Sequence, residues 1–171
     1  MNWNTNMDNK LRNIILYICE RYPEKQELSN ARLTKLVYLS DWKNVLNHGK
    51  QLTDISWVFN YYGPFVDDVL VEAQKNPDLF VVKMEKTIYG NVKLVINAKD
   101  GLELNTQELL DANARGIIDA VIEKTRTKTW NQFIQMVYST YPVLTSDRGT
   151  RLNLIELSKK YRVTQQNLQK A

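Results

Sequence analysis

The sequence predicts a mostly helical α+β fold, with about six helices and one small antiparallel β element near residues 79–97. Three observations support this prediction. Apolar residues recur at intervals of three and four positions over most of the chain, which is the spacing of one helical face. One stretch, 79–97, instead places two apolar runs on either side of a turn. The 171 residues show no internal repeat and no long linker. A single domain over 1–165 is therefore expected, followed by a frayed tail at 166–171.

The first predicted helix lies near the N-terminus and ends before Pro23, because proline disfavours the helical conformation of the residue that precedes it. One face carries five apolar residues: Leu11, Ile14, Ile15, Ile18 and Tyr22. Cys19 lies beside this face. We interpret it as a buried structural thiol, since reactive thiols need an accessible and electropositive setting.

The second predicted helix begins at Ser29-Asn30, which offers N-cap oxygens, and runs to about Asn47. Its apolar residues cover so much of the circumference that we expect it to be buried on several sides. His48-Gly49 ends it, because glycine adopts the left-handed conformation without steric cost. We interpret His48 as a helix-end residue beside the negative end of the dipole.

The third segment, 52–65, is rich in aromatic residues and closes on Gly63-Pro64, a turn signal. We predict a short extended stretch, a turn, and then a helix from about Pro64 to Lys75. On an alternating strand, Trp57, Phe59 and Tyr61 share one face.

The remaining elements follow in order. Residues 79–84 and 92–96 flank Tyr89-Gly90-Asn91 and predict the β-hairpin. Asn105 and Glu108 have capping-box spacing before a helix to about Thr125. A further helix starts near Trp130 and stops at Pro142, and a last short helix ends near Arg162.

Charge is distributed unevenly along the chain. Residues 1–114 contain 13 Lys/Arg and 15 Asp/Glu, whereas 115–171 contain 10 Lys/Arg and only 4 Asp/Glu. The basic residues of this last third are scattered and form no run. Three interpretations stay open for it: a solvated surface, a contact with an acidic protein, or a contact with nucleic acid.

Composition and motifs exclude several function classes. The longest apolar run, 14–19, is far too short to span a membrane, and no secretory signal is visible. One cysteine and one histidine provide neither a disulfide nor a zinc site, and the six glycines form no phosphate-binding loop. His48 has no identifiable catalytic partner. We therefore expect a cytoplasmic protein without catalytic residues, metal or cofactor.

The aromatic segment is the more informative feature. The cluster could form part of the core, or it could be a contact surface, because Trp and Tyr dominate protein interfaces. A hairpin and one helix layer cannot easily hide both faces of such a segment. We therefore predict partial exposure, with Trp57, Phe59, Tyr61 and Phe65 as partner-binding residues.

Two segments resemble a known family. Residues 33–42 read LTKLVYLSDW, and 59–65 read FNYYGPF. Together they resemble the Panacea domain, also called the SocA-like antitoxin domain, in which a K-L-L-Y-x-A-D helix precedes a glycine, an aromatic segment and Y-G-P. The matching positions are Lys35, Leu36, Tyr38, Asp41, Gly49, Tyr62, Gly63 and Pro64. Members commonly carry Thr-His before Pro-Trp near the C-terminal end. Residues 137–143 (VYSTYPV) keep only the proline, as in a divergent member.

The resemblance implies an antitoxin that neutralises a partner toxin by direct contact, as in type II toxin–antitoxin systems, without catalysis. Family members pair with many unrelated toxins, and some are associated with phages and mobile elements. One member is similar to a proteolytic adaptor, which would add a cellular protease as a partner. No membrane partner is expected. The alternative is a regulatory protein that binds nucleic acid through the basic C-terminal third.

The family motif positions are expected to have structural roles. Lys35 and Asp41 are six residues apart and lie on different faces of their helix, so they cannot pair with each other. We expect them instead to fix the turn at 62–64 by hydrogen bonds. Gly49 is expected to end the helix.

Overall fold

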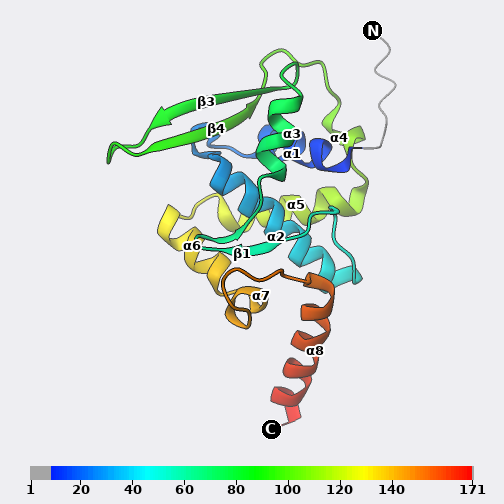
Figure 1. Cartoon of the computed structure of the whole chain (residues 1–171). Coiled ribbons are helices and arrows are strands. Elements are labelled where there is room, and N and C mark those ends of the chain that lie inside the picture. The colour runs from blue at the N-terminus through cyan, green and yellow to red at the C-terminus, as the bar shows by residue number, and fades with distance from the viewer. Residues whose placement is uncertain (1–8, 171) are drawn as a thin grey trace.

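The computed structural model describes residues 9–170. They form eight α-helices, two of them only four residues long, and two antiparallel sheets of two strands each. This confirms the predicted mostly helical α+β class. In chain order the elements are α1 (Lys10–Arg21), a 3-10 turn (Lys25–Glu27), α2 (Asn30–His48), β1 (Val58–Asn60), β2 (Gly63–Phe65), α3 (Asp68–Lys75), β3 (Phe80–Lys86), β4 (Val92–Ala98), α4 (Thr106–Leu109), α5 (Ala112–Thr125), α6 (Trp130–Tyr138), α7 (Tyr141–Leu144) and α8 (Leu154–Lys170) (Figure 1).

Helix α2 runs through the middle of the molecule and packs against α1, α3, α5, α8 and both hairpins (Figure 1). Thirteen of its residues are buried, so the prediction of a helix covered on several sides is confirmed. The Ser29 side chain caps the start by accepting a hydrogen bond from the backbone N–H of Arg32 at 3.2 Å. Gly49 ends the helix with φ of 73°, as predicted from the glycine.

The predicted hairpin is present as β3–β4, paired from Phe80 opposite Ala98 to Lys86 opposite Val92. Its inner end joins the core: Phe80 and Ile96 are buried, and the Ile96 N–H donates to the carbonyl of Leu28 at 2.9 Å. Its outer end projects from the helices on the side of the molecule where α6 lies (Figure 1).

Several predicted helices have different boundaries. The helix expected to run from Trp130 to Pro142 ends at Tyr138, and Pro142 lies in the first turn of α7. The helix expected from Pro64 starts only at Asp68, because 63–65 pair with 58–60 as a second small hairpin. The helix expected over 105–125 is interrupted. Asp111 accepts from the N–H of Ala114 at 2.7 Å and caps a new helix, α5, after the single turn of α4.

The last helix continues beyond Arg162, where the sequence analysis places its end, and reaches Lys170. Most of its second half is exposed, and α8 extends away from the body of the molecule (Figure 1). The Arg162 guanidinium attaches it to the end of α2 by donating to the carbonyl of Leu46 at 2.8 Å. Residues 1–8 of the predicted domain and Ala171 of the predicted tail lie outside the described residues.

Candidate functional site

The structure divides the aromatic segment between the core and the surface. Trp57 and Phe59 are buried, with exposed fractions of 1% and 6%, whereas Tyr61 and Tyr62 are 75% and 82% exposed. Phe65 is partly buried. The predicted shared face of 57, 59 and 61 ends at the β1–β2 turn, which begins after residue 60. The prediction of a contact role for Trp57 and Phe59 is therefore wrong, because neither side chain is accessible to a partner.

A segment distant in sequence covers the buried aromatic pair. The N–H of Phe59 donates to the carbonyl of Thr150 at 2.9 Å, and the N–H of Leu152 donates to the carbonyl of Trp57 at 2.8 Å. The residues after α7 thus lie along β1 like an additional strand. The rings themselves pack on helices: Trp57 lies 5.4 Å from Tyr38 of α2 and Phe59 lies 6.2 Å from Tyr138 of α6, measured between ring centroids.

Asp41 is fully buried in α2, and its carboxylate organises the loop from 51 to 57. Oδ1 accepts from the backbone N–H groups of Leu52 (2.8 Å) and Thr53 (2.9 Å), while Oδ2 accepts from the Thr53 hydroxyl and from the indole N–H of Trp57 (2.9 Å). Burial raises the pKa of Asp41 to about 6, and these hydrogen bonds oppose the rise. The expected bonds from Asp41 to the turn at 62–64 are absent from the described structure, since Asp41 faces the preceding loop.

Lys35 lies about two turns earlier on α2, and its side chain points into a different environment. The residue is 1% exposed, and within residues 9–170 its ammonium group has no hydrogen-bond or ion-pair partner, so burial is the only cause of its pKa shift. The expected hydrogen bond to the turn at 62–64 is therefore wrong as well. Lys35 Nζ lies 5.8 Å from the ring centroid of Phe65 in β2. Burial lowers the pKa of Lys35 from the ordinary 10.5 to about 8.

The Lys35 side chain lines a cavity of about 310 Å³ between α2, the β1–β2 hairpin and α6, which we call the Lys35 cavity. Aromatic rings supply much of its wall. Its lining consists of Ala31, Lys35, Asn60, Tyr62, Phe65, Trp130, Ile134 and Tyr138. In the part of the chain that the structure describes, Lys35 is therefore the one charged residue in a largely apolar lining.

A larger open groove of about 650 Å³ adjoins this cavity, and we call it the hairpin groove. Its lining includes Glu27 and residues 29–32 around the start of α2, and residues 87–89 and 91–94 around the β3–β4 turn. Ala31, Phe65 and Trp130 line both spaces, so the cavity and the groove form one continuous depression. The Arg32 guanidinium forms an ion pair with Glu27 at 3.5 Å and lies over the rings of Trp130 and Phe133 in α6.

Large apolar side chains are exposed along this depression. Ile88, Tyr89 and Val92 at the hairpin end are 93%, 85% and 58% exposed, and Trp130 at the start of α6 is 43% exposed. Apolar residues gathered at a concave surface are typical of protein interaction sites. The sequence analysis did not assign these residues to a site. Ile88 and Tyr89 could have been noticed, because apolar side chains are unusual at the exposed turn of a hairpin.

Gly63 lies against Tyr138, which lines the Lys35 cavity, and we expect Gly63→Ala to be more destabilising than Gly149→Ala. Both glycines have positive φ, 91° and 84°, so each alanine introduces backbone strain of about 1–3 kcal/mol. A Cβ at residue 63 would also lie 3.2 Å from Cε2 of Tyr138, whereas a Cβ at residue 149 would meet nothing within 4 Å. Urea unfolding of the two variants measures the difference. Equal losses would contradict the contact with Tyr138.

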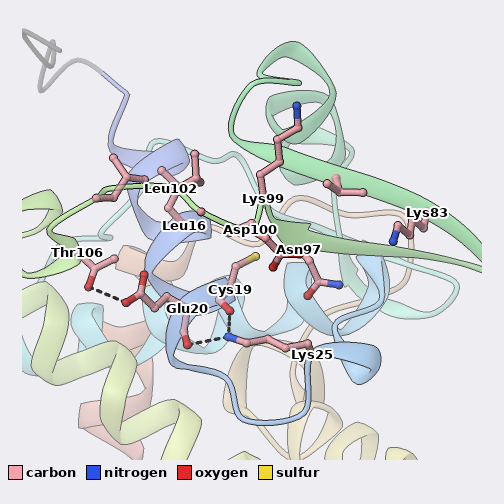
Figure 2. A pocket seen from close by; sticks show the side chains of 14 residues that line it. Leu16, Cys19, Glu20, Lys25, Lys83, Asn97, Lys99, Asp100, Leu102 and Thr106 are labelled. Carbon is pink, nitrogen blue, oxygen red and sulfur yellow. Dashed lines mark hydrogen bonds between the residues drawn. The ribbon is translucent and has the colours of Figure 1, made fainter. Parts of the chain in front are cut away.

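Another cavity, of about 440 Å³, lies between α1, the β3–β4 hairpin and the loop at 99–104 (Figure 2). Cys19 lies in its wall, fully buried, and burial raises the pKa of the thiol to about 12. The predicted burial of this cysteine is confirmed. Lys25 closes one side by donating to the backbone carbonyls of Cys19 and Glu20, and Thr106 contacts the Glu20 carboxylate (Figure 2).

Some basic residues of 115–171 form ion pairs or hydrogen bonds with other residues of the fold. Arg126 pairs with Glu123 at 3.0 Å, Lys159 pairs with Glu156 at 2.6 Å, and Arg162 binds backbone carbonyls at the end of α2. Because Glu123 and Glu156 belong to the same segment, these pairs leave its excess of Lys and Arg over Asp and Glu, 10 against 4, unchanged. Nucleic-acid binding through this region stays a prediction.

Catalysis by histidine, metal binding and membrane insertion would each need a particular feature of the structure. His48 is exposed at the end of α2, next to Gly49. Within this range, no three His, Cys, Asp or Glu side chains are grouped as a metal site would require. None of the helices described is long and apolar enough to cross a membrane.

The chain matches a known protein family. The family described as "Antitoxin SocA-like, Panacea domain" matches residues 33–142. This range contains Lys35, Asp41 and the turn at 62–64, together with the β3–β4 hairpin and α6. Searches of the curated proteins and of the solved structures find no match. Since the family match spans more than half of the chain, the protein belongs to the SocA-like antitoxin family with the Panacea domain.

Proposed function

We propose that this protein is an antitoxin that neutralises a toxin by binding it directly, in the bacterial cytoplasm and without catalysis of its own. The observation that carries the proposal is the continuous depression formed by the Lys35 cavity and the hairpin groove. It lies mostly within the residues that match the antitoxin family. Its exposed aromatic and aliphatic side chains have no covering element within residues 9–170.

The character of this surface supports protein binding. Trp and Tyr provide large, rigid contact areas and are enriched among the residues that dominate binding energy. Here Trp130, Tyr62, Tyr89 and Tyr138 all border the depression. They come from α6 and from both hairpins, so a partner placed there would touch three parts of the fold at once.

Bacterial growth tests the function. The reading frame adjacent to the gene for this protein is induced alone and together with the full chain. Growth arrest that co-expression relieves, with co-purification of the two proteins, supports neutralisation by direct contact. A harmless neighbour, or relief of arrest without formation of a complex, contradicts the proposal.

Ile88→Ser is expected to weaken the complex by about tenfold to hundredfold, because it removes an apolar side chain from the hairpin groove. Ile88 is 93% exposed, so the free energy of unfolding should change by no more than about 0.5 kcal/mol. Calorimetric titration of the co-purifying partner measures the affinity. The matched control is Leu168→Ser on α8, which removes another exposed apolar side chain and should leave affinity unchanged. Equal effects of the two substitutions would exclude the groove as the contact site.

A further inference from the structure

Lys35 is an unusual residue to find buried without a partner. The residue is 1% exposed and lines the cavity, yet within residues 9–170 its ammonium group has neither a hydrogen-bond acceptor nor a carboxylate partner, and burial alone shifts its pKa. Other buried polar groups of α2 are satisfied: Asp41 accepts several hydrogen bonds, and Arg32 pairs with Glu27 and Tyr22. Lys35 is the exception on this helix.

The burial of Lys35 without a partner does not stabilise the folded protein. Burial of an unpaired charge is costly, and the lowered pKa of Lys35 expresses that cost. A methionine or leucine would fill the same space with apolar contacts. A lysine that weakens the free protein but faces a cavity is better explained by an interaction with a bound group.

The surroundings define the chemistry of that group. Among residues 9–170, Lys35 is the only charged residue that lines the cavity, and the remaining wall is formed by aromatic and aliphatic side chains, with the amide of Asn60. An anionic group would remove the cost of the buried ammonium, and apolar atoms next to it would contact Phe65, Trp130 and Tyr138. A carboxylate on a short aliphatic stem combines both properties.

The adjoining groove indicates how the carboxylate is carried. Phe65 and Trp130 line both spaces, so a ligand in the cavity can continue past them into the hairpin groove, which is twice as large, at about 650 Å³ against about 310 Å³. A chain passing along the groove would place a side chain, and not its end, in the cavity.

We propose that the Lys35 cavity receives the side-chain carboxylate of an Asp or Glu from a segment of the partner protein, whose neighbouring apolar residues occupy the hairpin groove. This inference rests on the proposed function for the identity of the partner. The recognition chemistry itself can be tested without the partner.

Three short peptides test it on the full chain. Acetyl-Leu-Glu-Leu-amide and acetyl-Leu-Gln-Leu-amide differ only in charge, and acetyl-Leu-Leu carries a carboxylate at its chain end. Each is titrated to millimolar concentration while the indole N–H signal of Trp130 is followed by NMR. We expect the Glu peptide to bind at least about tenfold more tightly than the Gln peptide and the chain-end peptide, because only the Glu side chain pairs with the buried ammonium from within the groove.

Two variants test whether Lys35 causes the preference for the Glu peptide over the Gln peptide. Lys35→Met should lose the preference for Glu over Gln, while Lys43→Met, a change of a partly exposed lysine on the same helix, should keep it. Four results overturn the proposal: no binding of the Glu peptide, equal binding of Glu and Gln peptides, a preference that survives Lys35→Met, or chain-end binding as tight as that of Glu. A harmless adjacent gene product together with Lys35-dependent Glu binding would refute the antitoxin function but not the carboxylate site.

Discussion

Replacement of Asp41 by alanine is expected to reduce the free energy of unfolding by more than about 4 kcal/mol. The change leaves the N–H groups of Leu52 and Thr53, the Thr53 hydroxyl and the Trp57 indole N–H without their acceptor. Each buried donor that loses its partner costs about 1–3 kcal/mol. The loop from 51 to 57 should detach from α2 and expose Trp57, which urea unfolding and the fluorescence of the folded state would detect.

Asp41→Asn keeps the effect measurable if the alanine variant does not fold. Its amide oxygen can still accept from the two backbone N–H groups, but its NH₂ group faces the Trp57 indole, which only donates. We expect a loss of about 2–3 kcal/mol. Adding Trp57→Phe to Asp41→Asn should then cost less than Trp57→Phe costs in the wild type, because the conflicting donor is gone. Additive losses would show that the indole bond does not contribute.

Local signals in the sequence predict the central part of the fold. The start of α2 at Ser29, its end at Gly49 and the β3–β4 hairpin all depend on residues close together in the chain, and all three are present. The break between α4 and α5 also depends on residues close together in the chain, but the capping-box spacing at 105–108 predicts one continuous helix. Asp111 is the N-cap that starts α5, and the sequence analysis did not consider it.

The candidate site depends on contacts that local patterns do not encode. Trp57 and Phe59 look like surface aromatics until the segment at 149–152 is placed along β1. Asp41 and Lys35 belong to one motif, but the helix directs them to a donor-rich loop and to an apolar cavity respectively. The motif therefore identified two important residues and predicted their partners incorrectly.

Lys35→Met is expected to stabilise the free protein by about 3 kcal/mol near pH 7. Lys35 has an ordinary pKa of 10.5 in the unfolded chain and about 8 in the folded protein, and each unit of difference corresponds to about 1.4 kcal/mol. Between pH 8 and pH 10.5 the unfolded chain binds the additional proton, so the stability of the wild type rises with pH in this window. The advantage of the methionine variant should therefore shrink to about half by pH 9.5.

Urea unfolding of both proteins from pH 6.5 to pH 9.5 measures this difference, and Lys43→Met serves as the control. Lys43 is partly exposed on α2, so its replacement should change stability by no more than about 0.5 kcal/mol. A Lys35→Met variant that is less stable than the wild type would show that the ammonium has a stabilising partner in the folded protein. A more stable variant whose advantage declines above pH 8 would show that the chain keeps a buried, unpaired charge at the cost of stability. An unpaired buried charge contributes to binding only when an anionic group of a partner pairs with it. The unfolding measurements and the peptide titrations therefore test the same ammonium group independently.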